Sequence, residues 1–146
     1  MTPTRLRELL AALGVVGVLA YLVLMLTYAD LPAIPRTAPL SLLIVGLVEL
    51  QTANITRNRL RSRGGAKPIA PLTVARLAAL AKASSLAGAA IAGFWAAVLV
   101  YTAPRTDEFG TAGTDAVTAG LGLGAAAVLV VGGLMLERVC RIPKDR

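Results

Sequence analysis

Residues 57–67 read RNRLRSRGGAK and lie between two apolar stretches of the chain. A basic cluster beside a membrane-spanning segment stays on the cytoplasmic side of the bilayer. The cluster therefore predicts that the two flanking stretches cross a membrane and meet in a cytoplasmic loop. Its basic side chains are also expected to contact anionic lipid headgroups; they are Arg57, Arg59, Arg61, Arg63 and Lys67.

The composition is typical of a membrane protein rather than a soluble domain. Of 146 residues, 56% are hydrophobic and only 16% are charged, and the mean hydropathy is +0.71. A soluble domain has about 25% charged residues. The net charge of +7 would also suit a nucleic-acid-binding protein, but only 4% of the residues are aromatic, which leaves few side chains to stack on bases. We therefore expect lipid contact and no nucleic-acid partner.

Residue types that common catalytic and metal sites need are scarce in this chain. There is no histidine, and Cys140 is the only cysteine. A zinc site of the usual Cys/His type, an intrachain disulfide and a histidine general base are therefore excluded. We expect no cofactor, no metal and no enzymatic activity.

Three segments are apolar enough to span a bilayer as helices, which takes about 20 residues. Residues 9–28 contain no charge, residues 71–102 begin with a proline that suits a first helical turn, and residues 115–139 begin with an acid that favours a helix N-terminus. A cleaved signal peptide is the alternative for residues 9–28. Its apolar core would exceed the usual length of about 7–15 residues, so we expect a retained span.

A fourth span, residues 39–56, is weaker because its apolar run ends at Glu49. A helix lying on the membrane surface is the alternative, but the charge distribution argues against it. With four crossings, all lysines and arginines except Arg36 and Arg105 fall on the cytoplasmic side. We therefore predict an all-α fold: residues 1–146 form one integral membrane bundle of four transmembrane helices in the inner (plasma) membrane, with both termini cytoplasmic.

Glu49 falls near the middle of the second span, where an unpaired carboxylate would be costly. Lys82 and Ser85 lie in a stripe of small residues on the third span. We hypothesise that Glu49 faces Lys82 and Ser85 between these two spans. Two alternatives stay open. In the first, the pair serves only to fix the register of the two helices. In the second, Lys82 extends to the membrane surface and does not contact Glu49.

Small residues four positions apart let transmembrane helices approach closely. The third span carries Gly88, Ala89 and Gly93, and the fourth carries Gly120-x-x-x-Gly124. We expect these five residues to lie at helix contacts.

Four stretches of the chain together resemble a known family. They are residues 1–7 (MTPTRLR), 81–89 (AKASSLAGA), 101–105 (YTAPR) and 136–143 (LERVCRIP). This pattern is similar to the small actinobacterial membrane-protein family called domain of unknown function 3180, over nearly the whole chain. The resemblance implies a four-span inner-membrane protein and supplies no activity.

Two functions fit these features, and both need a membrane. The first is a non-enzymatic accessory, scaffold or assembly partner of other membrane proteins, with a protein partner or a second copy in the bilayer. The alternative is a small proton-coupled transporter in which Glu49 is the titrating carboxylate. A membrane enzyme ranks third, because no pair of catalytic groups can be named.

Overall fold

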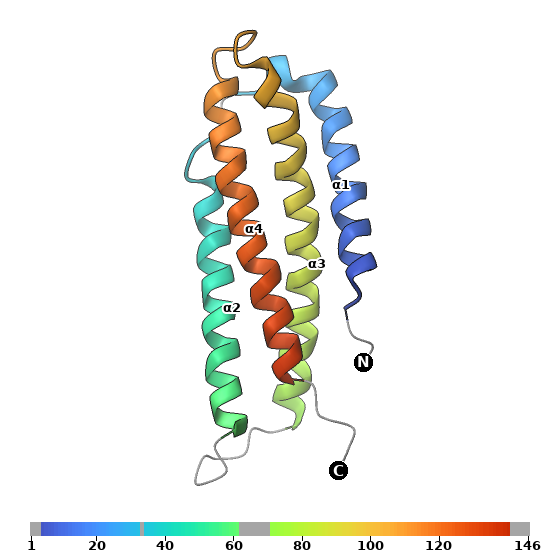
Figure 1. The fold of residues 1–146 in the computed structure, drawn as a ribbon, viewed down its shortest axis with the longest axis vertical. Coiled ribbons are helices and arrows are strands. Elements are labelled where there is room, and N and C mark those ends of the chain that lie inside the picture. Colours follow the sequence, from blue (N-terminus) through green and yellow to red (C-terminus); the bar gives the residue numbers. More distant parts are fainter. Residues whose placement is uncertain (1–3, 33, 62–70, 141–146) are drawn as a thin grey trace.

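The computed structural model describes residues 4–32, 34–61 and 71–140. These residues form four long helices and contain no strand, which confirms the predicted all-α fold (Figure 1). All four helices are long and apolar enough to cross a membrane. The helices are α1 (Leu6–Thr27), α2 (Ala38–Arg61), α3 (Pro71–Thr102) and α4 (Ala112–Cys140), and short 3-10 turns follow α1 (η1, Tyr28–Asp30) and α3 (η2, Ala103–Arg105).

The helix bounds follow the predicted segments closely, and the largest difference is in α2. This helix continues to Arg61, whereas the sequence predicted its end near residue 56. Arginine and leucine are good helix formers, so the beginning of the basic cluster extends the helix. Arg57, Arg59 and Arg61 therefore lie on α2, and Arg63 and Lys67 lie outside the described residues.

The helices are neighbours in the order α2–α4–α3–α1 (Figure 1). The inner pair, α3 and α4, each have two neighbours, whereas α1 packs along α3 and α2 packs along α4. The expected contact between the second and third spans is therefore not the main one, because each packs chiefly on the fourth. Two consecutive glycines of α4 explain how it accommodates both.

Gly132 and Gly133 of α4 meet different helices. A Cβ atom added to Gly132 would lie 3.1 Å from the carbonyl oxygen of Gly46 on α2. A Cβ atom added to Gly133 would lie 2.9 Å from the carbonyl oxygen of Ala81 on α3. Since consecutive helical residues point about 100° apart, the missing side chains admit one neighbouring backbone on each side.

The contact between α1 and α3 is equally close and depends on Gly93. A Cβ atom on Gly93 would overlap the carbonyl oxygen of Leu13 and lie 3.0 Å from the nitrogen of Gly17. Gly88 and Ala89 are also buried, and Gly88 packs against Val130 of α4. Gly88 and Gly93 therefore lie at contacts with neighbouring helices, and Ala89 is buried beside Gly88.

The prediction for Gly120 and Gly124 is wrong within this chain. Both glycines are exposed, and no atom of the described residues of a neighbouring helix lies within 4 Å of an added Cβ. Gly122 is the buried one, and the indole ring of Trp95 occupies the space of its missing side chain. Two positions along a helix correspond to a rotation of about 200°. Placing Gly122 under Trp95 therefore turns Gly120 and Gly124 outward.

Candidate functional site

Glu49 is a buried acidic residue halfway along α2. Only 7% of the residue is exposed, and it faces α4, where its Cβ lies 3.4 Å from a Cβ position built on Gly132. Its Oε2 atom is buried and has no hydrogen-bond partner in the described part of the chain. An ionisable group in the middle of a helix that spans a membrane is costly and marks a candidate functional site.

The two residues predicted to face Glu49 lie on α3. Ser85 is fully buried, and its Cβ lies 3.2 Å from a Cβ position built on Gly133. Its hydroxyl donates a hydrogen bond to the carbonyl oxygen of Lys82 at 3.0 Å, so this donor is used within its own helix. Lys82 is half-buried. Glu49 and Ser85 thus contact consecutive residues of α4, and the Ser85 hydroxyl does not satisfy Glu49.

A second buried acid, Asp115, lies in the first turn of α4 and therefore near an end of the helices rather than at their middle. Its side chain is almost fully buried, and each carboxylate oxygen accepts a hydrogen bond. The Tyr28 hydroxyl donates to Oδ2 at 2.7 Å, and the backbone N–H of Ile34 donates to Oδ1 at 2.9 Å. Asp115 therefore fastens the end of α1 and the connection to α2 onto α4.

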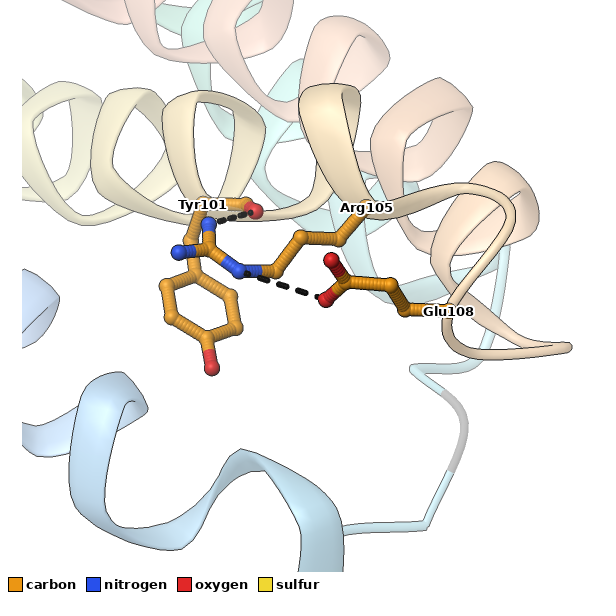
Figure 2. A network of polar contacts seen from close by, with 3 residues as sticks. All are labelled: Tyr101, Arg105 and Glu108. Carbon is orange, nitrogen blue, oxygen red and sulfur yellow. Dashed lines mark hydrogen bonds and ion pairs between the residues drawn. The ribbon is translucent and has the colours of Figure 1, made fainter.

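The Tyr28 ring, whose hydroxyl donates to this second carboxylate, packs against two other aromatic rings. The ring of Tyr28 lies 5.1 Å from that of Tyr101 and 5.3 Å from that of Phe109, between centroids. The Arg105 guanidinium lies 4.3 Å from the centre of the Tyr101 ring and donates to the Tyr101 carbonyl oxygen at 2.9 Å. Figure 2 shows this contact and the 3.8 Å ion pair of Arg105 with Glu108. Sequence reasoning missed this cluster, although its members lie near span ends, where tyrosine is enriched.

A third polar contact joins the beginning of the described chain to the last turns of α4. The backbone N–H of Thr4 donates to Oε1 of Glu137 at 2.8 Å, and the Thr4 hydroxyl donates to Oε2. The beginning of α1 and the end of α4 therefore lie at the same end of the four-helix row. Arg57 and Arg138 are exposed at this basic end.

A protein-family model matches residues 9–144, almost the entire chain. The chain belongs to the DUF3180 family. The resemblance found in the sequence is thereby confirmed, and the family is described as a protein of unknown function. No curated protein and no solved structure matches the chain. Family membership supplies no activity, so any role for this DUF3180 protein must be argued from its own residues.

The two buried acids of this DUF3180 protein differ in how many of their carboxylate oxygens accept a hydrogen bond. Asp115 has a donor for each oxygen, whereas Oε2 of Glu49 has none among the described residues. Depth in an apolar segment is enough to single out Glu49 in the sequence. Asp115 carries no such signal, because its donors Tyr28 and Ile34 come from a distant part of the chain. Across the described ranges, no group of three or more His, Cys, Asp or Glu side chains is placed to hold a metal ion.

Proposed function

We propose that this DUF3180 protein is a non-enzymatic accessory subunit that packs against another membrane protein and supports its assembly. The observation that carries the proposal is a face of α4 that no described helix of the chain covers. We call it the α4 outer face. Its exposed residues are Gly113, Val117, Gly120, Gly124, Ala127 and Val131.

The α4 outer face has the spacing and residue sizes of a helix contact. Its members recur every three or four positions, the repeat by which two helices pack along their length. All six are no larger than valine, and small residues let the backbones of transmembrane helices approach closely. Gly120 and Gly124 have open space where their side chains would be. A helix of another subunit would fill that space.

The open row of helices supports the same function. The end helices α1 and α2 each pack mainly along one neighbour, and α1 exposes large apolar side chains along its length, such as Leu26 at 83%. Lipid or a partner can cover these faces. The arrangement thus offers broad lateral surfaces and short connections on the side opposite the basic end, which suits a protein that works through contacts within the bilayer.

The test is a pair of glycine substitutions on the α4 outer face. Gly120→Leu combined with Gly124→Leu is expected to remove the partner from material purified in mild detergent. The melting temperature should not fall, because an added Cβ at either glycine meets no described atom within 4 Å. Gly14→Leu on α1 is the matched control, since an added Cβ there also meets nothing within 4 Å. A heteromeric complex unaffected by the double substitution would contradict the proposal.

A second candidate function is proton-coupled transport, and one observation favours it. The unpartnered Oε2 of Glu49 lies in the middle of a helix long enough to span a membrane, and such carboxylates often serve proton relays. The same purification separates the two functions. A homodimer that binds a small molecule in a pH-dependent way would favour transport, and a stable complex with a different protein favours the accessory role.

We also propose that the basic end faces the cytoplasm and contacts anionic lipid. Each lysine or arginine near an anionic surface contributes about 1 kcal/mol at low salt. A peptide of residues 57–67 is therefore expected to bind vesicles containing anionic lipid and to lose affinity as salt rises. Replacing Arg57, Arg59, Arg61 and Arg63 by glutamine should weaken binding by roughly 10²–10³-fold. Binding that salt leaves unchanged would disprove the electrostatic account, and neutral vesicles are the control.

A further inference from the structure

Arg105 lies just after α3, at the end of the helices opposite to Arg57 and Arg138 (Figure 1). It is the last residue of the candidate span Leu72–Arg105. A long basic side chain at the end of a span usually extends away from the apolar segment. The Arg105 side chain instead turns back along α3, because its Nη1 donates to the carbonyl oxygen of Tyr101, four residues earlier, at 2.9 Å (Figure 2). Its guanidinium therefore lies beside the last turn of α3, at the edge of the apolar segment.

The Tyr101 ring supports this guanidinium from one side. The Cζ atom of Arg105 lies 4.3 Å from the centre of the ring, which is a cation–π contact. The ring is itself held in place, because Tyr101 is only 7% exposed and packs 5.9 Å from the Tyr21 ring and 5.1 Å from the Tyr28 ring, between centroids. The position of the positive charge is therefore fixed by the fold before any ligand binds.

The guanidinium keeps N–H groups that can donate to an anion. It has five such donors, and within the described residues its one hydrogen bond is that to Tyr101. Oε2 of Glu108 lies 3.8 Å from Nε, which is longer than a hydrogen bond. The Glu108 side chain is 66% exposed, and an exposed ion pair of this kind is weak. An anion with better geometry can therefore displace Glu108.

An exposed apolar face of α3 begins next to this charge. Phe94 lies seven residues, or about two turns, before Tyr101 and therefore on the same face of the helix. Phe94 is 39% exposed, and the same face continues to Ala87, which is also exposed. At about 1.5 Å per residue, Phe94 is roughly 10 Å along the helix from Tyr101. An acyl chain spans half of a hydrocarbon core, which is about 15 Å, so a lipid bound at Arg105 reaches Phe94.

We infer that Arg105 binds the phosphate group of an anionic phospholipid, whose acyl chain lies on the α3 face that contains Phe94. Phosphate oxygens match the planar fork of a guanidinium, and the apolar face begins at the distance from the phosphate where the acyl chains of a lipid lie. A soluble phosphate would use the charge alone. The inference is independent of the accessory function, and the site lies at the opposite end of the helices from the basic cluster.

The experiment uses the full chain in mild non-ionic detergent and phosphatidylglycerol that carries a photoreactive diazirine within one acyl chain. After irradiation, the crosslinked peptides are located by mass spectrometry. We expect crosslinks around Phe94. In Arg105→Gln, the lipid concentration that gives half of the maximal crosslinking should rise roughly 10–100-fold, as for loss of a hydrogen bond between charged groups.

Arg36→Gln is the matched control, because Arg36 is exposed in the connection between η1 and α2, at the same end of the helices. This variant loses the same charge and should bind as the native protein does. An equal rise for Arg36→Gln and Arg105→Gln would overturn the inference, since general charge attraction would then explain the binding. Crosslinks that leave the α3 face unmodified, or equal crosslinking by zwitterionic phosphatidylcholine, would overturn it as well.

Two further measurements identify the ligand and keep the test valid if Arg105→Gln does not fold. Glu108→Gln removes the competing carboxylate and leaves the Tyr101 contacts of Arg105 in place. Its half-saturating lipid concentration should fall, and an equal or higher value would contradict the site. Glycerol phosphate, which has the phosphate without acyl chains, should not displace the lipid even in large excess. Displacement would show that the site holds a soluble phosphate and would overturn the lipid assignment.

Discussion

Replacing Asp115 by alanine is expected to lower the free energy of unfolding by about 3 kcal/mol, because it leaves one buried and one part-buried donor without this acceptor. The donors are the Tyr28 hydroxyl and the Ile34 backbone N–H, which lie 2.7 Å and 2.9 Å from the carboxylate oxygens. The change would release the end of α1 and the start of the connection to α2 from α4. Unfolding by added denaturing detergent, followed by circular dichroism, measures the effect.

Two comparisons identify the cause of the Asp115→Ala effect. Tyr28→Phe removes one of the two donors and should lower the free energy of unfolding of the native protein by about 1–2 kcal/mol. The same substitution should have little effect in the Asp115→Ala variant, because Tyr28 and Asp115 share one hydrogen bond. Glu108→Ala is the control, since Glu108 forms an exposed ion pair with Arg105 that is worth about 0–1 kcal/mol. Equal losses for Glu108→Ala and Asp115→Ala would disprove the role of the buried carboxylate.

Gly93→Ala is expected to have the second large effect, a loss of about 3 kcal/mol or separation of α1 from α3. The added methyl group would overlap the carbonyl oxygen of Leu13, which belongs to the backbone and cannot turn aside. Overfilling a packed contact usually costs about 1–3 kcal/mol, and a clash with backbone lies at the upper end. Disulfide crosslinking between cysteines introduced in α1 and α3, together with the melting temperature, measures the result.

Gly124→Ala is the control for Gly93→Ala, since the methyl group would meet nothing within 4 Å. Alanine is also favoured over glycine in a helix by up to about 1 kcal/mol, so this variant should be as stable as the native protein or slightly more so. A destabilisation of Gly124→Ala equal to that of Gly93→Ala would show that loss of glycine flexibility, rather than the close contact, is responsible.

Local features of the sequence predicted the helices well. Segment length and apolar content identified α1, α3 and α4, and the charge distribution identified α2 despite Glu49. Small residues on the third span indicated the contacts of Gly88, Ala89 and Gly93, which are buried. The Gly120–Gly124 spacing did not by itself say whether this small-residue face meets its own chain or another one. Only the position of Gly122 under Trp95 decides that rotation.

The pairing of Glu49 illustrates the same limit. Its depth followed from its position in an apolar segment, but its neighbour depended on which helix packs against α2. The structure places α4 there, through Gly46 and Gly132, so that the Glu49 Cβ lies against the backbone of Gly132. The Asp115 cluster was missed because Tyr28 and Ile34 are 87 and 81 residues away in the chain.

By itself, the sequence determined that this protein has four apolar helices, a basic end and one acid in the middle of an apolar helix. These properties follow from the composition of single segments, since a bilayer selects each span by its length, apolar content and flanking charge. The tertiary structure alone decided the order α2–α4–α3–α1, the close contacts at Gly93, Gly132 and Gly133, and the different surroundings of Asp115 and Glu49. Helix packing in a membrane depends on the close approach of backbones from segments distant in the chain. The sequence of one segment therefore does not determine which helix packs against it.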